Sequence, residues 1–545
     1  MTENFEPTIL VFACNWCGYP AATLTGVNRI SYPASVKIIR VMCTGRIEPS
    51  FMMKAFECGA DGVAVVGCRI DNCHYTDGNK HALKRIEAVK KLLKYTGLGE
   101  DRLRYEWLSA SEKAKFLNLV NNMYADLKKI GPSPIPKTEK KEIMTFDKKA
   151  VDDLIADTGA HDCVECGKCT SVCPVARFDP DFAPRVIVLR ALEGVSDSLS
   201  KDRDIWSCIT CEMCNSMCPY KVDYSGFIQG MRSEAILLGN EPECSQGGLL
   251  QSMMRVMAHT KEQNRLDWVP GDVKIADKGE VLYFVGCAPH LDAVFYDRNL
   301  NLTSTAISAI KILNYAGVTP VVSNEEVCCG HDLNWAGDNE HFEKLMERNV
   351  EMIKKSGAKK VVFACPECYR TFNIDYQDIL GDLDFEMMHI TEYLADLLDQ
   401  GKIELKAAGT EEDTVTYHDP CRLGRHLGVY EEPRDILKEV GVAVKEMANT
   451  KDKAQCCGVS AWITCGKAAK QMQLDRIAEA KRTGAHRLLT MCPKCRIHLD
   501  CAVSKEVDID RALIDIPMED YVTYVAKRLG LWESAQSSKH ENEGD

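Results

Sequence analysis

The 545-residue sequence contains no long apolar stretch. Its longest apolar runs, at 281–286 and 361–364, have the length of strands and fall far short of the roughly 18 residues that a membrane helix needs. The first residues also lack a basic segment followed by an apolar stretch and a cleavage site, so nothing marks the chain for export. We therefore expect a cytoplasmic protein with no membrane span.

An excess of positive charge is lacking as well, since Asp and Glu outnumber Lys and Arg by 80 to 67. The net charge of −13 argues against non-specific nucleic-acid binding, which depends on clustered Lys and Arg, and favours protein partners and small molecules. The sequence has no GxGxxG after a strand and no GxxxxGK[ST], so it shows neither a dinucleotide nor a P-loop fingerprint. A flavin, if the protein uses one, is expected on a partner.

Cysteine, in contrast, is abundant, with 27 residues. In a long chain without an export signal the thiols are expected to stay reduced, and their clustering favours metal ligation over disulfides. The chain is too long for one hydrophobic core. Its pattern predicts a multi-domain fold of α/β and α class: a small α/β domain, a helical domain and a duplicated α/β domain. The predicted boundaries are 1–135, a linker at 136–150, 151–275, 276–405, 406–532 and a disordered tail at 533–545.

The helical domain carries the most specific motif, a CxxCxxCxxxCP run that occurs twice. In bacterial ferredoxins such runs hold two 4Fe-4S clusters, and the fourth cysteine of each run ligates the other cluster. Structural zinc remains the alternative. The predicted cluster ligands are Cys163, Cys166, Cys169 and Cys218 for one cluster and Cys208, Cys211, Cys214 and Cys173 for the other.

The duplicated domain repeats a five-cysteine order of C, CCG and CPxC. The interval from the CCG motif to the CPxC motif is 36 positions between Cys329 and Cys365 and 35 between Cys457 and Cys492, which predicts two similar lobes facing one another. Adjacent cysteines suit a centre larger than one metal ion, although zinc or ordinary cubane sites remain alternatives. The two sets are Cys287, Cys328, Cys329, Cys365 and Cys368, and Cys421, Cys456, Cys457, Cys492 and Cys495.

The first domain places five cysteines at or near predicted strand ends, and four would suffice for a cluster. Which one is spare stays open, and zinc is again the alternative. These residues are Cys14, Cys17, Cys43, Cys68 and Cys73.

Some cysteines and histidines lie outside the repeated patterns. Four such cysteines are interpreted as small buried hydrophobic residues. Four histidines near the CCG motifs could donate a proton to a product thiolate, with a structural role favoured over this one. The residues concerned are Cys58, Cys244, Cys465 and Cys501, and His290, His331, His418 and His426.

These motifs resemble known families. The C, CCG, CPxC pattern is similar to the cysteine-rich CCG domain of the B-type subunit of heterodisulfide reductase, and the ferredoxin runs resemble its C-type subunit. Their fusion resembles the D-type subunit. Residues 8–130, with CNWC, MCTG and GCRIDNCH, resemble the delta subunit of methyl-viologen-reducing hydrogenase.

The resemblance implies a function in anaerobic metabolism such as methanogenesis. It implies one 2Fe-2S cluster in the first domain, two cubane 4Fe-4S clusters, and a non-cubane 4Fe-4S cluster in each CCG lobe, whose ten cysteines are then catalytic. A small disulfide, the mixed disulfide of coenzymes M and B or a relative of it, is reduced between the two non-cubane clusters. Electrons come from a flavin-bifurcating A-type flavoprotein with FAD and from hydrogenase or formate dehydrogenase subunits, in a hetero-oligomer. The competing hypothesis is a non-catalytic electron relay.

Overall fold

The structure, a computed structural model, describes residues 5–137, 146–407, 413–463, 465–504 and 510–532. Most of the predicted linker, at 138–145, and the predicted tail at 533–545 lie outside these ranges. Within them, no helix is both long and apolar enough to cross a membrane.

The first domain is a parallel four-stranded sheet in the order β2-β1-β3-β4 with helices on both faces. In β1, Ile9, Val11 and Ala13 pack on one face while Phe12 packs on the other, as the two-residue repeat of a strand requires. Its elements are β1 (Ile9–Cys14), α1 (Gly18–Val27), β2 (Val36–Val41), α2 (Pro49–Glu57), β3 (Gly62–Cys68), α3 (Gly78–Tyr95), β4 (Leu103–Leu108) and α4 (Lys113–Ile130).

Strand β4 corrects one sequence expectation. The pattern predicts a continuous helical stretch over 81–130, but the structure ends α3 at Tyr95 and inserts the strand Leu103–Leu108 before α4. This strand lies at the edge of the sheet, where charged residues such as Arg104 and Glu106 are tolerated because one side faces solvent. The sequence of this strand, LRYEWL, alternates apolar and charged residues, so a strand signal is present, and the helical interpretation of 81–130 overlooks it.

The middle region is helical, as the sequence predicts. Short helices surround the two ferredoxin runs, and the longer α11 packs across them. The elements are α5 (Lys148–Asp157), α6 (Lys168–Val172), α7 (Pro184–Leu192), α8 (Ser196–Ser200), α9 (Asp204–Ser207), α10 (Met213–Met217), α11 (Tyr224–Leu237) and α12 (Leu249–His259).

The CCG region forms two α/β lobes, each with its own parallel sheet, in the orders β5-β6-β7 and β11-β10-β8-β9. The first lobe contains β5 (Val281–Phe284), α13 (Ala288–Val294), α14 (Thr303–Tyr315), α15 (His331–Ala336), α16 (Asn339–Ser356), β6 (Lys360–Phe363), α17 (Pro366–Arg370), α18 (Gln377–Leu380), β7 (Glu386–His389) and α19 (Ile390–Asp399). The second contains β8 (Thr414–His418), α20 (Glu432–Glu439), β9 (Ala443–Val444), α21 (Lys467–Arg482), β10 (Arg487–Thr490), α22 (Pro493–Val503), β11 (Met518–Asp520) and α23 (Tyr521–Arg528).

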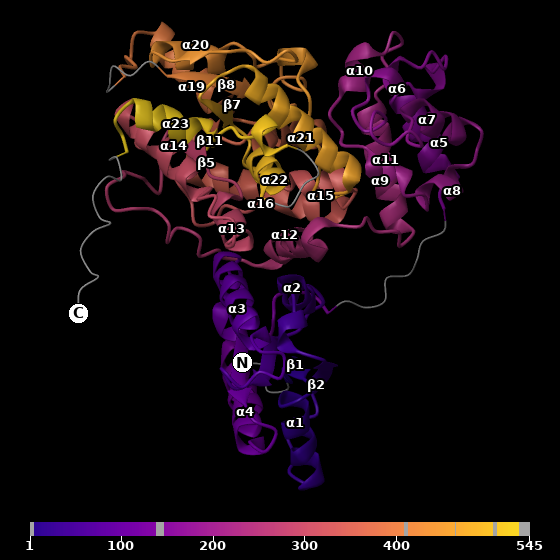
Figure 1. Cartoon of the computed structure of the whole chain (residues 1–545), viewed down its shortest axis with the longest axis vertical. Helices are drawn as coiled ribbons and strands as arrows, with labels where there is room; N and C mark the ends of the chain where they lie inside the picture. Colours follow the sequence, from indigo (N-terminus) through magenta and orange to yellow (C-terminus); the bar gives the residue numbers. More distant parts are fainter. Residues whose placement is uncertain (1–4, 138–145, 408–412, 464, 505–509, 533–545) are drawn as a thin grey trace.

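The first domain docks on α12, the last helix of the middle region, and on α13 of the first CCG lobe. Figure 1 shows it beneath these two helices, apart from α5–α11. In this contact Arg255 of α12 pairs with Glu57 of α2 at 3.0 Å and with Asp338 at 2.6 Å, and the rings of Tyr95 and His290 meet edge to face at 5.5 Å. Apolar residues of both partners form one continuous core.

Candidate metal centres

All 27 cysteines lie in the described part of the chain, and each is a free thiol. The structure gathers most of them into five groups. Closely spaced thiols that form no disulfide are suitable donors for iron–sulfur clusters, so the residues fit such groups.

The two ferredoxin runs cross over. Cys173 lines one cavity with Cys208, Cys211 and Cys214, called here the Cys208 site. Cys218 lines a second cavity with the first three cysteines of the other run, Cys163, Cys166 and Cys169, called here the Cys163 site. The fourth cysteine of each run thus lies with the first three of the other.

The N-terminal site brings together all five cysteines of the first domain. The Sγ atoms of Cys14 and Cys68 lie 3.7 Å apart, Cys17 also contacts Cys68, and Cys43 contacts Cys73. They lie at the carboxyl ends of β1 and β3 and in the loops after the strands, because parallel strands end at the same edge. Burial raises the pKa of the Cys68 thiol, so a bound metal would be needed to hold it as a thiolate.

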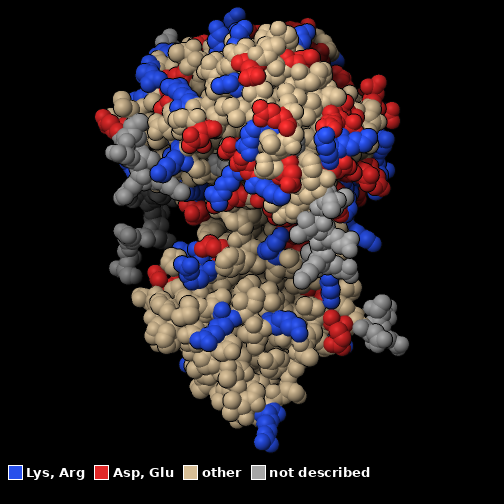
Figure 2. All heavy atoms as spheres, turned by 90° about the vertical axis from the view of Figure 1, so that its right-hand side faces the viewer, with Lys and Arg blue, Asp and Glu red and all other residues tan. Residues whose placement is uncertain are grey.

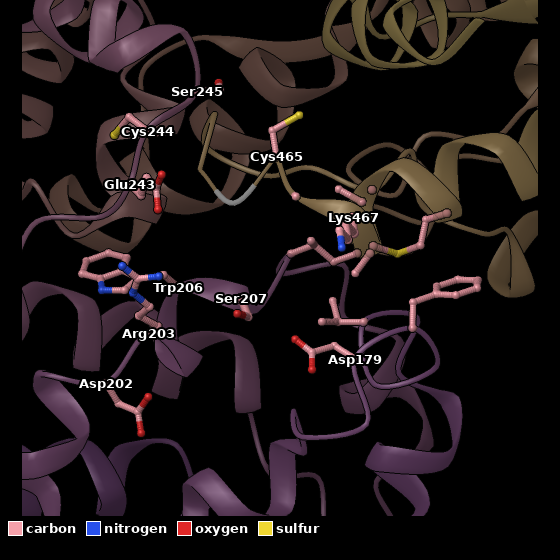
Figure 3. Close-up of a pocket in the computed structure, with 18 of the residues that line it drawn as sticks. Asp179, Asp202, Arg203, Trp206, Ser207, Glu243, Cys244, Ser245, Cys465 and Lys467 are labelled. Atoms are coloured by element: carbon pink, nitrogen blue, oxygen red, sulfur yellow. The ribbon is translucent and has the colours of Figure 1, made fainter. Parts of the chain in front are cut away.

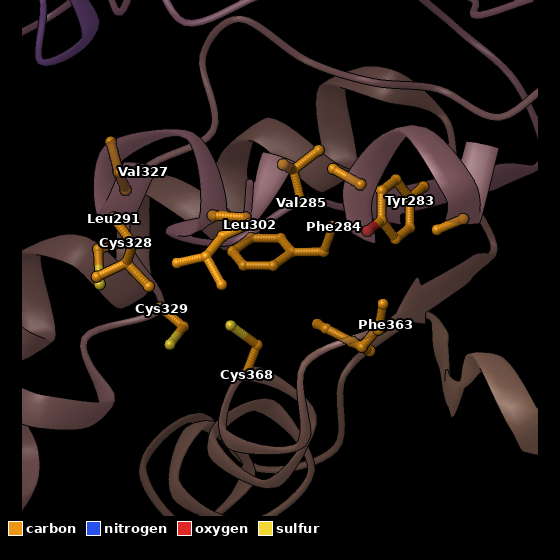
Figure 4. Packing of buried hydrophobic residues seen from close by; sticks show 14 of the residues in the cluster. Tyr283, Phe284, Val285, Leu291, Leu302, Val327, Cys328, Cys329, Phe363 and Cys368 are labelled. Atoms are coloured by element: carbon orange, nitrogen blue, oxygen red, sulfur yellow. The ribbon is translucent and has the colours of Figure 1, made fainter. Parts of the chain in front are cut away.

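Each CCG lobe forms one five-cysteine site, and the two sites share the same order of thiol contacts. In the Cys328 site, Cys287 lies 3.3 Å from Cys328, and the chain of contacts continues through Cys329 and Cys368 to Cys365. Figure 4 shows three of these thiols beside buried aromatic residues of the first lobe. In the Cys456 site the same chain runs through Cys421, Cys456, Cys457, Cys495 and Cys492.

The second cysteine of each CC pair is electrostatically distinct. Hydrogen bonds from neighbouring thiols, first of all from the preceding cysteine, lower the pKa of Cys329 and of Cys457.

The glycine that follows each CC pair is required by its backbone conformation. Gly330 and Gly458 have φ angles of +81° and +88°, and a Cβ at Gly458 would lie 2.7 Å from the Ala469 carbonyl oxygen. This backbone requires glycine in both CCG motifs.

Buried ion pairs hold the loop of the first cysteine in each lobe. In the first lobe the Glu326 carboxylate accepts hydrogen bonds from the backbone N–H groups of Val285 and Gly286, at 2.9 and 2.8 Å, and pairs with Arg265 at 3.0 Å. In the second lobe Arg434 binds both carboxylate oxygens of Asp419, at 2.8 and 3.0 Å. These contacts hold both loops in place.

The two CPxC motifs meet at the boundary between the lobes. Lys494, inside the second motif, donates to Glu367, inside the first motif, at 2.8 Å, and also contacts Asp332. Lys494 and Asp332 are 3% and 7% exposed. The charges of Cys365 and Cys492 also interact across this boundary. The Cys328 and Cys456 sites therefore lie on either side of a buried ion cluster of Lys494, Asp332 and Glu367.

Arg422 connects three of the sites. It follows Cys421 directly, and its guanidinium donates to the Thr210 carbonyl oxygen at 2.6 Å and to the Thr210 hydroxyl at 2.7 Å, inside the second ferredoxin run. Its Nε atom lies 3.0 Å from Nε2 of His331, which follows the first CCG motif. The Cys208 site is thus attached to the Cys456 site and, through His331, to the Cys328 site.

Comparisons with known proteins agree with this organisation. The methyl-viologen-reducing hydrogenase delta subunit model matches residues 9–131, the 4Fe-4S dicluster domain model matches 158–222, and the cysteine-rich domain model matches 281–373 and 415–500. The chain is 33% identical over 401 residues to the D subunit of the dihydromethanophenazine:CoB–CoM heterodisulfide reductase of Methanosarcina barkeri, covering 68% of this chain and 94% of that protein. The chain belongs to the family of heterodisulfide reductase D subunits.

Further relatives match parts of the chain. The corresponding D subunit of Methanosarcina mazei is 37% identical over 278 residues, which cover 50% of this chain and 64% of that protein. The iron-sulfur D subunit of the F420-non-reducing hydrogenase vhc of Methanococcus voltae is 46% identical over 141 residues, 26% of this chain and 98% of that protein. The chain is therefore an iron–sulfur electron-transfer subunit of an oxidoreductase complex, extended by a domain of the hydrogenase delta type.

The four histidines singled out in the sequence lie in different environments. His331 and His426 join the Arg422 network, with His426 at 2.9 Å from Glu212, and His418 accepts from Arg476 at 3.0 Å. His290 is buried with both ring nitrogens unpartnered. None of these contacts is to a cysteine thiol.

Sequence reasoning missed His498, whose Nδ1 lies 3.6 Å from the Cys457 sulfur. It lies one helical turn after Cys495 in α22, and this i,i+3 spacing is a signal that could have found it.

Two of the cysteines expected to be buried are exposed instead, because Cys58 ends α2 and Cys465 lies before α21 at the surface. Cys244 and Cys501 are partly buried.

A cavity of about 830 Å³ opens between the helical region and the second CCG lobe. Figure 3 shows Trp206, Arg203, Cys244 and Lys467 around it. Its wall also includes Gly458, the residue after Cys457. A small molecule in this cavity would lie within one residue of the Cys456 site.

Proposed function

We propose that this chain is the catalytic as well as the electron-transfer subunit of a heterodisulfide reductase-like complex, and that it reduces a small disulfide at the paired Cys328 and Cys456 sites. One observation carries the proposal: the two sites have the same order of thiol contacts and lie on either side of one buried boundary. Two equivalent centres suit a two-electron cleavage of a disulfide, because each centre can bind one of the two sulfurs that are released.

The thiol sets fit the expected cofactors. The N-terminal site has enough thiols for a 2Fe-2S cluster, the Cys163 and Cys208 sites for one cubane 4Fe-4S cluster each, and the two five-cysteine sites for non-cubane 4Fe-4S clusters. When bound, these clusters would supply the two electrons that convert a disulfide and two protons into two thiols. The chain itself supplies the ligands, a dry environment and the positive charge near the products.

Charge at the lobe boundary suits this reaction. Lys494 and Arg422 are buried cations at the boundary, 3% exposed each, and Arg422 lies 4.4 Å from the centre of the Trp335 ring. A buried cation favours a nearby anionic sulfur because the low dielectric strengthens their attraction. These residues would therefore stabilise a product thiolate until it takes up a proton.

The cavity beside Gly458 is the proposed entry for the disulfide. It is large enough for a drug-sized molecule and carries polar groups among apolar ones, as small-molecule sites do. Its wall carries both signs of charge, so Lys467 and Arg203 would bind only an anionic end of the substrate. The acidic residues of the wall are Asp179, Asp202, Glu241 and Glu243. The disulfide of coenzymes M and B, named for the relatives, is the proposed substrate, and a related bacterial disulfide is the alternative.

A partner surface is proposed around the N-terminal site. On the side of the molecule that Figure 2 shows, charged residues are sparser on the first domain than on the part above it. Trp16, Met42 and Tyr75 near the cysteines are 41%, 55% and 45% exposed, and exposed apolar patches mark interaction sites. We infer that an FAD-containing A-type flavoprotein contacts this surface, together with hydrogenase or formate dehydrogenase subunits.

The test is the oxidation of reduced viologen by anaerobically purified protein with added low-molecular-weight disulfides. Disulfide-dependent oxidation is expected. Replacing Cys457 by Ala should abolish it, whereas replacing Cys58, exposed and outside all five sites, should leave it unchanged. An absence of turnover with every disulfide tried, in protein that carries its clusters, would contradict the proposal.

A second candidate function is a pure electron relay. The buried ion cluster at the lobe boundary favours it, because Lys494 already pairs with Glu367 and Asp332 where a substrate would have to lie. A relay would transfer electrons from a viologen to a protein acceptor but would not respond to thiols or disulfides. The response of the oxidised protein to added thiol separates the two functions.

A further inference from the structure

Tyr224, the first residue of α11, stands between the two ferredoxin-type sites. It lines the cavity of the Cys208 site and also that of the Cys163 site. The side chain is only 4% exposed, and its hydroxyl has no hydrogen-bond partner. The preceding residue, Asp223, caps the helix, and the Tyr224 N–H donates to Asn215 at 3.1 Å, so its backbone is fixed.

An unpartnered buried hydroxyl is costly, by about 1–3 kcal/mol, and native proteins rarely leave one unpaired. The Tyr224 hydroxyl is therefore available to donate a hydrogen bond to a group held in one of the two cavities. The Asn215 oxygen that accepts from the Tyr224 N–H also lies 3.5 Å from the sulfur of Cys214, which links Tyr224 to the Cys208 site.

Positive charge gathers at the same site. Arg232 donates to the Cys208 carbonyl oxygen at 2.6 Å, Arg425 to the Cys211 carbonyl oxygen at 2.7 Å, and Arg422 to Thr210 between them. Arg232 and Arg422 are 0% and 3% exposed. Nearby cations and hydrogen bonds to sulfur both stabilise the reduced, more negative form of a cluster, which raises its reduction potential.

We propose that the Tyr224 hydroxyl donates a hydrogen bond to a sulfur of the cluster held at the Cys208 site and thereby raises its reduction potential above that of the cluster at the Cys163 site. This inference rests on the proposed cluster assignment. The electron would then settle on the cluster nearer the second CCG lobe, where Arg422, the residue after Cys421, donates to Thr210 of the second ferredoxin run. Tyr224 is thus a positioning residue that acts through the cluster. By raising the reduction potential of the cluster at the Cys208 site, it makes electron transfer toward the CCG lobes favourable.

The test is a redox titration of the full chain followed by electron paramagnetic resonance. Tyr224→Phe removes only the hydroxyl, and the midpoint of one cubane signal is expected to fall while the other stays in place. Tyr220→Phe is the matched control, because Tyr220 lines only the Cys163 cavity and is 52% exposed. Cys166→Ser identifies the signal of the Cys163 site, which should be the one that Tyr224→Phe leaves unchanged.

Unchanged midpoints in Tyr224→Phe, or a fall in the Cys163-site signal alone, would overturn the inference. Should that variant lose its clusters, a fluorinated tyrosine at position 224 replaces it. As a stronger donor it should raise the Cys208-site midpoint, and no change would again overturn the inference. A wild-type protein without two cubane signals would instead refute the cluster assignment itself, so the two failures are distinguishable.

Discussion

Replacing Lys494 by Met should loosen the contact between the two CCG lobes. Met fills a similar volume but removes the ammonium group that pairs with Glu367 and Asp332. Breaking a buried ion pair by removing one partner costs about 3–5 kcal/mol, because the other charges stay buried without compensation. For a unit of about 250 residues, this corresponds to a fall in Tm of about 6–20 °C.

Anaerobic scanning calorimetry of the cluster-loaded protein measures this change. The control is Lys355→Met, on α16 of the first lobe, whose pair with Glu351 is at the surface, both side chains being at least 60% exposed. Exposed pairs contribute little, so the control should match the wild type. A Tm of Lys494→Met within about 2 °C of this control would refute the reasoning that the ion cluster holds the lobes together.

The remaining predictions concern clusters and electrons. Metal analysis of anaerobically purified protein should give iron for one 2Fe-2S, two cubane and two non-cubane clusters, about 18 irons, and fewer than about 10 with stoichiometric zinc would contradict this count. Cys328→Ala or Cys456→Ala should abolish disulfide reduction while spectroscopy still detects both cubanes, and full activity in either variant would refute the paired-site mechanism. Rapid-freeze spectroscopy should find no fast transfer from the N-terminal site to the cubanes until the flavoprotein is added, because the first domain docks on α12 and α13 rather than on α5–α11. Equally fast transfer in the isolated chain would count against this arrangement.

Cysteine spacing predicted which thiols lie together, even where they are far apart in sequence, as Cys287 and Cys328 are at 41 positions. That these groups of thiols bind clusters stays a prediction. The crossed ferredoxin runs and the two five-cysteine orders appear in the structure as the pattern implies. The five thiols of the first domain meet because parallel strands end at one edge of the sheet.

Contacts between distant segments could not be predicted in this way. The partner of Arg422, Thr210, lies 212 positions away, and only the packing of the helical region on the second lobe brings the two together. The pairing of Lys494 with Glu367 depends on how the lobes face each other, although the two residues hold the same place in their motifs. Tyr224 gave no signal at all, because an aromatic residue at a helix start usually only packs.

The most direct test of the central claim is the paramagnetic spectrum of the oxidised, cluster-loaded protein before and after addition of a low-molecular-weight thiol. A disulfide-reducing pair of sites predicts an altered signal on thiol addition, which Cys328→Ala and Cys456→Ala should each change or abolish while the reduced cubane signals persist. A spectrum that thiol leaves unchanged, in protein with its full iron content, would contradict catalysis at these sites and leave the chain as an electron relay.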